Sequence, residues 1–98
     1  MALSSKQTRY LRSLAHHLKP VVQIGGRGVT AALIGATDDA LEAHELIKVK
    51  LGDIEDRSEV RKAAGTLSEE TGSDVVQMIG KTIILFRQRD KDSEIRLP

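Results

Sequence analysis

Cysteine is absent from this chain, and none of its apolar runs is long. Without cysteine the protein can form neither a disulfide nor a thiolate metal site, which makes a reducing compartment its natural environment. No stretch approaches the roughly 20 apolar residues that a membrane-spanning helix needs, and Met1–Ser5 lacks the apolar core of a signal peptide. We therefore expect a cytoplasmic protein.

Aromatic residues are nearly absent too, since Tyr10 and Phe86 are the only ones. The apolar patterns around them predict that both face the core. A protein that binds nucleic acid by stacking needs exposed aromatic side chains. We therefore expect any nucleic acid to be held mainly through phosphates and sugars, with recognition of its shape and little reading of its sequence.

Acidic residues are missing from the first part of the chain. Residues 1–37 contain five basic residues and no acid, whereas residues 38–98 contain ten basic and fourteen acidic residues, a local balance of −4. The net charge of +1 conceals this division. A segregated basic end favours an anionic partner, although a chance distribution of surface charges is the alternative.

At 98 residues the chain is long enough for one domain and too short for two. Its apolar patterns predict the order αβαβαββ, an α/β (α+β) single-domain sandwich. Helices are expected from about residue 5 to Pro20, over Thr30–His44 and from Asp56 to Gly72, and strands over 21–24, 45–51, 74–79 and 82–87. The first strand, helix and strand would form a parallel βαβ unit. Residues 1–87 would then form the domain, and 88–98 a charged tail that is mobile or loosely docked.

Short signals predict where these elements begin and end. Capping boxes are expected for Ser4 with Gln7 and for Asp56 with Glu59, a left-handed helix end at Gly72, a turn at Gly52-Asp53 and a hairpin at Gly80-Lys81.

The predicted helices are amphipathic. The apolar side of the first contains Leu3, Gln7, Tyr10, Leu11, Leu14 and Leu18, with Ala15 at its edge. Its other side carries Lys6, Arg9, Arg12 and His16, a face with only one sign of charge. The second helix has the apolar stripe Val29, Ala32, Leu33, Ala36, Ala40 and Leu41, and the outer residues Asp38, Asp39, Glu42 and Glu45. The third carries Val60, Ala63, Ala64 and Leu67 inward. In strand 45–51, Lys48 and Lys50 share the side opposite the core.

The stretch from Pro20 to Thr30 is the most informative part of the sequence. Val21, Val22 and Ile24 predict a buried strand, three glycines follow within four residues, and Thr30 can cap the next helix. The free amides of that helix, its dipole and Arg27 would together form an anion site.

Two nucleotide motifs fit this chain poorly. Gly26–Ala31 matches the dinucleotide pattern G-x-G-x-x-A, but the remaining residues cannot supply the second βαβ half. Gly80-Lys81-Thr82 resembles the end of a phosphate-binding loop, but the earlier glycine position is Val75 and a strand follows.

The third pattern is G-x-x-G at Gly25–Gly28. In such a loop the outer glycines let the backbone press against a polynucleotide. Any tight strand-to-helix turn can be rich in glycine, so the basic first helix is what favours nucleic acid. The predicted surface runs from Lys6, Arg9, Arg12 and Lys19 toward Arg27.

No catalytic set can be assembled. His16 and His17 are adjacent and so point in different directions, and His44 is followed by Lys48 where a zinc protease has its second histidine. We expect no enzymatic activity, no cofactor and no metal.

Several segments together resemble the CRM domain, of the free-standing bacterial YhbY type. They are Ser4–Gln7, Leu14–His16, Leu18–Val22, Gly25–Gly28, His44–Lys50 and Ile79–Thr82, and they occur in the right order from about residue 3 to Arg87.

This resemblance implies an RNA-binding domain linked to precursors of the large ribosomal subunit. It also implies a four-stranded mixed sheet backed by helices, similar to the C-terminal domain of bacterial initiation factor 3. The RNA-contacting loop would be Gly25, Gly26, Arg27 and Gly28, supported by Arg9, Arg12, Lys19, Lys48, Lys50 and Lys81. Two alternatives remain: a module that docks on a ribosomal protein through the acidic second helix, and a small nucleotide-binding enzyme.

Overall fold

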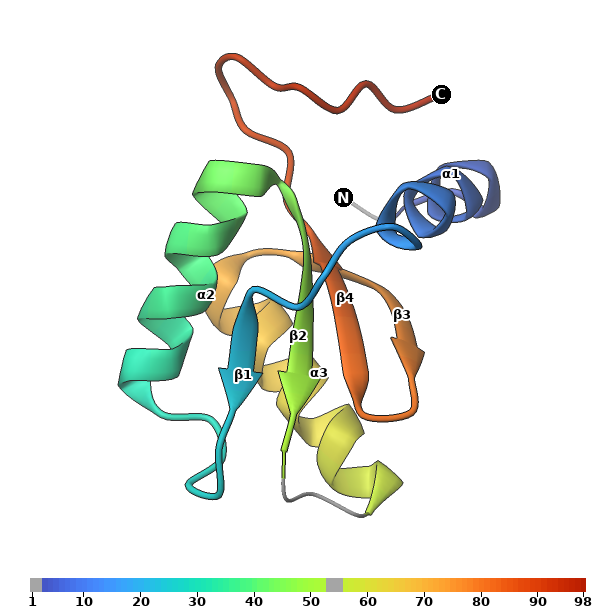
Figure 1. Ribbon diagram of the computed structural model, residues 1–98. Coiled ribbons are helices and arrows are strands. Elements are labelled where there is room, and N and C mark those ends of the chain that lie inside the picture. Colours follow the sequence, from blue (N-terminus) through green and yellow to red (C-terminus); the bar gives the residue numbers. More distant parts are fainter. Residues whose placement is uncertain (1–2, 53–55) are drawn as a thin grey trace.

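The computed structural model describes residues 3–52 and 56–98. Its helices are α1 (Ser5–Ala15), α2 (Ala31–His44) and α3 (Arg57–Thr71), and its strands are β1 (Val22–Ile24), β2 (Leu46–Leu51), β3 (Asp74–Ile79) and β4 (Thr82–Phe86). They form one four-stranded sheet in the order β1-β2-β4-β3 (Figure 1). β1 pairs with β2 in parallel and the other pairings are antiparallel, which confirms the predicted fold class.

Alternation along the strands divides the core into two clusters, one on each face of the sheet. On one face α2 and α3 cover a cluster that contains Val22, Ile24, Leu41, Ile47, Val49, Leu51, Val60, Ala63, Ala64, Leu67, Ile83 and Leu85. On the other face α1 packs Leu11 and Ala15 on Leu46, Val76, Ile84 and Phe86. These contacts lie near one end of β2 and β4, so α1 leaves the rest of its face uncovered (Figure 1).

The side chains predicted to cap the helices do so. Ser4 and Gln7 form the capping box of α1, and the Thr30 hydroxyl accepts from the Leu33 amide at 3.1 Å. Asp56 caps α3 by accepting from the Ser58 amide, and this hydrogen bond holds the pKa of Asp56 below its ordinary value. The predicted capping box also requires the Glu59 side chain to accept a hydrogen bond from the Asp56 amide, and the described residues show no such bond.

Glycines end elements where the sequence predicts them. Gly72 closes α3 with φ 65°, and Gly80 turns the β3–β4 hairpin with φ 56°. Both values lie in the left-handed region, which favours glycine because no Cβ is present. The turn predicted at Gly52-Asp53 includes a residue outside the described ranges.

The apolar face of α1 is narrower than predicted. Leu11 and Ala15 are buried, whereas Tyr10 and Leu14 are 36–38% exposed. The helix ends at Ala15 and not at Pro20 as predicted, so Leu18, which is 38% exposed, lies beyond it. A helix that covers only one end of a sheet face buries a narrow stripe, and its flanks stay in solvent. The prediction that Tyr10 faces the core is therefore wrong, and the same prediction for Phe86 is confirmed.

The buried stripe of α2 is also displaced from the prediction. Ala32 and Ala36 are exposed, and Thr37 is fully buried. The Thr37 hydroxyl donates to the Leu33 carbonyl at 2.8 Å, so a residue that reads as polar enters the core with its hydrogen bond satisfied.

Glu45 is predicted on the outer face of α2, but the structure buries it completely. It follows α2 directly, with φ 63°, a conformation that costs most residues about 1–3 kcal/mol. This backbone turns the side chain away from solvent and toward residues 88–98. The helix period predicts an exposed carboxylate because it assumes that the helix continues through residue 45.

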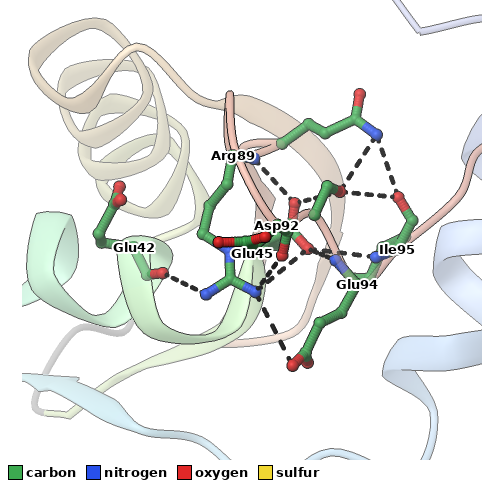
Figure 2. Close-up of polar contacts among 8 residues, drawn as sticks. Glu42, Glu45, Arg89, Asp92, Glu94 and Ile95 are labelled. Carbon is green, nitrogen blue, oxygen red and sulfur yellow. Dashed lines mark hydrogen bonds and ion pairs between the residues drawn. The ribbon is translucent and has the colours of Figure 1, made fainter.

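The Glu45 carboxylate holds residues 88–98 in place (Figure 2). One of its oxygens accepts from the Arg89 amide at 2.8 Å and the Ser93 hydroxyl at 2.7 Å. The other accepts from the amides of Glu94 and Ile95 at 2.7 and 3.1 Å. Ile95 and Leu97 also pack against the cluster under α1. The sequence predicts a mobile or loosely docked tail, whereas the structure shows one anchored by specific contacts.

These contacts set the ionisation of Glu45. Burial by itself raises the pKa of the carboxyl, but hydrogen bonds from Arg89, Ser93, Glu94 and Ile95 favour the charged form and together lower the pKa below 4.5. The folded state therefore binds this proton more weakly than the unfolded chain, and ionised Glu45 stabilises the fold.

Replacing Glu45 by Gln should lower the free energy of unfolding by about 2 kcal/mol, because bonds to a charged acceptor are lost and buried donors go unmet. Urea unfolding at neutral pH measures this loss. Glu42→Gln is the matched control, since the Glu42 side chain is 71% exposed and makes only a 3.4 Å ion pair with Arg87. It should cost less than about 1 kcal/mol.

Wild type and Glu45→Gln together also test the direction of the pKa shift of Glu45. The contribution of Glu45 should be complete above its unfolded pKa near 4.5 and should be lost as the pH falls through the lower folded value. The difference between wild type and Glu45→Gln should therefore narrow on acidification. A difference that grows at acid pH would contradict the network.

Candidate nucleic-acid interface

The loop Gly25–Gly28 joins β1 to α2 and projects beyond the end of the sheet (Figure 1). The Gly28 amide donates to the Gly25 carbonyl at 3.1 Å, which closes a tight turn. Gly25, Gly26 and Arg27 are exposed, and a Cβ added at any of the three glycines would meet no heavy atom within 4 Å. The loop is therefore open to a ligand.

Two backbone donors of this loop lack an acceptor in the part of the chain that the structure describes. The amides of Gly26 and Arg27 donate to no acceptor within residues 3–52 and 56–98. Thr30 satisfies the Leu33 amide at the start of α2, and the first turn of that helix contains no acid. Free amides, the positive end of a helix dipole and the exposed Arg27 side chain together favour an anion.

Parallel pairing brings other cations to the same end of the molecule. α2 and α3 each begin where β1 or β2 ends, and the β3–β4 hairpin turns at this end as well (Figure 1). Two backbone bonds join these segments, from Gly52 to Ile24 at 2.9 Å and from Leu51 to Lys81 at 2.8 Å. Arg27, Lys50 and Lys81 are all exposed around this end.

The uncovered part of the sheet face leads away from this end. Lys50 pairs with Gln23 on one side and with Thr82 on the other, while Lys48 pairs with Ile84. Residues paired in this way point to the same face. Lys48 and Lys50 therefore lie on the face that α1 only partly covers, as their alternation predicts.

The cations of α1 border this face from its other end. Lys6, Arg9 and Arg12 are exposed, as is Lys19 after the helix. Figure 1 places α1 and the glycine loop at opposite ends of β1, so the cations of α1 are separated in space from Arg27. Lys48 and Lys50 of β2 lie between these two groups of cations.

The two flanks of α1 differ in their surroundings. On one flank Gln7 donates to the Pro98 carbonyl at 3.4 Å, and Leu14 lines a hollow together with Ile95. Helical spacing puts Arg12 on the opposite flank. Arg12 is therefore directed toward the uncovered part of the sheet and Lys6 is not.

Ion pairs occupy other charges of the molecule. Arg87 pairs with Asp38 and Glu42, and Arg89 with Glu45 and Glu94. Within the described ranges, no such pair involves any cation predicted to contact RNA; these are Lys6, Arg9, Arg12, Lys19, Arg27, Lys48, Lys50 and Lys81. Asp38 and Glu42 of α2, and Glu94 of the tail, thus have cationic partners away from the loop.

Two cations at the loop end were not predicted from the sequence. Arg57 and Arg61 of α3 line a hollow with Val60, Met78 and Gly80. The sequence contains a signal for them, because helices that follow two parallel strands begin at the same end of the sheet. Reading the two strand-to-helix junctions together would have placed α3 at this end.

A comparison with known families agrees with this geometry. The model of the CRS1/YhbY (CRM) domain matches residues 3–87. The chain belongs to this family. The match covers every helix and strand of the described fold and includes the glycine loop.

Relatives of this CRM domain are similar over their whole length. The RNA-binding protein of Haemophilus influenzae is 41% identical over 96 residues, covering 98% of this chain and 95% of that protein. The Probable RNA-binding protein YqeI of Bacillus subtilis is 43% identical over 98 residues, covering 98% and 99%. The solution structure of the hypothetical protein SAV1595 from Staphylococcus aureus has a TM-score of 0.85 at 44% identity, covering 99% and 100%.

Within the described ranges, no helix of this CRM domain is long and apolar enough to cross a bilayer.

Alanine substitutions can test which glycine of the loop is required by its backbone conformation. Gly28 has φ 72°, in the left-handed region, whereas Gly26 has no positive φ. Gly28→Ala should lower the free energy of unfolding by about 1–2 kcal/mol, since a Cβ is strained there. Gly26→Ala should leave it unchanged or raise it by up to about 1 kcal/mol. Equal losses in urea unfolding would contradict the loop geometry.

Proposed function

We propose that this protein binds RNA through its backbone, without catalysis, and acts in assembly of the large ribosomal subunit. The observation that carries the proposal is the open Gly25–Gly28 loop beside Lys48 and Lys50. Within residues 3–52 and 56–98, the amides of Gly26 and Arg27 have no acceptor and these lysines form no ion pair. The names of the relatives support RNA as the ligand. The ribosomal role is the one that the family resemblance implies.

In this mechanism one phosphate lies against the loop and the start of α2. Backbone amides donate to its oxygens, and Arg27 adds a charged contact. Lys48, Lys50 and Arg12 neutralise neighbouring phosphates along the uncovered face. Each contact releases condensed counterions, which gives affinity that depends on salt.

The positions of the histidines support a binding role. His16 and His17 follow α1, and His44 ends α2, so all three lie away from the glycine loop (Figure 1). A general base must lie within hydrogen-bond reach of the reacting group. The loop itself contributes backbone donors and one guanidinium, which suit a phosphate contact that involves no proton transfer.

Docking on a ribosomal protein through α2 is the alternative. Asp38 and Glu42, two of the acids on that helix, already pair with Arg87. A partner would have to compete with these contacts, so the observation favours RNA. Association with ribosomes that survives nuclease treatment and high salt would favour the alternative.

The charge contacts can be counted from the salt dependence of binding to a short single-stranded RNA. Lys48→Gln and Lys50→Gln should each reduce the log–log slope by about 0.7, because one phosphate contact is lost. Arg12→Gln should do the same and should weaken binding more than Lys6→Gln. Lys62→Gln is the control, because Lys62 is exposed beside Glu59 on α3. A slope that is unchanged in all three site variants would contradict the proposed surface.

The loop can be tested by placing one negative charge on it. Gly26→Asp should reduce RNA affinity at least tenfold, because a carboxylate would occupy the phosphate position. Gly65→Asp adds the same charge at an exposed, uncrowded position of α3 and should have little effect. Equal affinities of the two variants would exclude the loop from the interface.

The ribosomal role needs a test in cells. Crosslinking followed by mapping of the bound RNA should recover large-subunit ribosomal RNA, and the Gly26→Asp variant should lose these crosslinks. Recovery of unrelated RNAs alone would leave RNA binding intact and overturn the ribosomal part.

A further inference from the structure

One row of side chains crosses all four strands on the sheet face that α1 only partly covers. Residues that are direct partners in neighbouring strands point to the same face. The registers of the three strand pairs therefore place in one row Gln23, Lys50, Thr82 and Ile79. The irregularity in β3 lies between Val75 and Gln77, so it does not displace Ile79 from this row.

Ile79 is the apolar end of the row and is 54% exposed. Its neighbour Met78 pairs with the core residue Ile83 and so points to the opposite face, where it lines a hollow with Val60 of α3. A single exposed apolar residue is ordinary on a protein surface. What distinguishes Ile79 is that it shares a face with Lys50, which forms no ion pair within residues 3–52 and 56–98.

The distance across the row from Lys50 to Ile79 suits one nucleotide. Neighbouring strands lie about 4.8 Å apart, so β2 and β3, which β4 separates, are about 10 Å apart. A nucleotide spans a similar distance from its phosphate to the outer edge of its base. On the other side of Lys50 the sheet ends after one strand, β1, so a base has less surface to rest on there.

We infer that Thr82 and Ile79 form a platform for one unpaired base of an RNA strand whose phosphate is bound by Lys50. The aliphatic side chain of Ile79 packs against the flat face of the base. Every base has such a face, so the platform accepts any sequence. It takes the place of the aromatic platform that this chain, with only Tyr10 and Phe86, cannot build.

This inference rests on the proposed RNA binding and adds the form of the RNA to it. Bases in a duplex are stacked on one another, whereas bases in a single strand can turn outward and lie on a protein surface. A surface that combines a phosphate contact with a base platform therefore favours single-stranded RNA.

The test compares oligouridine with an RNA strand of the same length that lacks its bases, by fluorescence anisotropy at fixed salt. Wild type should bind oligouridine about fivefold more tightly, near the lower end of what a base gains on an aromatic side chain. Ile79→Ser should reduce this preference to less than about twofold. Its affinity for the abasic strand and its salt slope should stay unchanged, because the phosphate contacts remain. Unchanged binding of the abasic strand also shows that the variant is folded.

Met78→Ser is the matched control, because it removes an apolar side chain of similar exposure from the other face of the same strand. It should retain the full preference for oligouridine. Ile79→Phe should increase the preference to tenfold or more, since an aromatic ring stacks on a base, and Met78→Phe should not.

The outcomes separate this inference from the proposed function. Binding of both strands with equal affinity by wild type, or a preference that survives Ile79→Ser, would overturn the platform and leave RNA binding through phosphates intact. Equal losses of preference in Ile79→Ser and Met78→Ser would overturn it as well. Binding to neither strand would overturn both the platform and the proposed function.

Discussion

The parallel pairing of β1 with β2 determines where the other parts of the molecule can lie. The register that matches Val22 with Val49 and Ile24 with Leu51 brings the ends of both strands together. A helix follows each strand, so α2 and α3 both begin at this end of the sheet (Figure 1). The glycine loop, the hairpin at Lys81 and the lysines of β2 meet there for the same reason. Residues more than 50 positions apart thereby border one surface.

A second constraint is the pairing of acids where α2 finishes. Asp38 and Glu42 contact Arg87, while Glu45 accepts hydrogen bonds from backbone amides and lies near Arg89. These contacts gather at the end where α2 finishes and where the tail is bound. Cations outside these pairs remain available to an anionic ligand.

Most of the fold could be predicted from the sequence, because its signals are local. Capping at Ser4 and Thr30, the left-handed end at Gly72 and the alternation through β2 each depend on a few neighbouring residues. The exposure of Tyr10 could not be predicted in this way, because it depends on how much of the sheet α1 covers. The burial of Glu45 depends on donors more than 40 residues away. For the site, the loop and its lysines were predicted individually, but their arrangement around an uncovered sheet face required the register of the strands.

The contacts beneath α1 have a consequence for the order in which the chain can fold during synthesis. Leu11 and Ala15 pack on Ile84 and Phe86, and Ile95 and Leu97 close the same cluster. Nearly the whole chain must therefore leave the ribosome before the first helix has a surface to rest on. Until then its apolar stripe stays uncovered, and its basic face, which the nascent chain presents first, is free to meet RNA before the sheet exists.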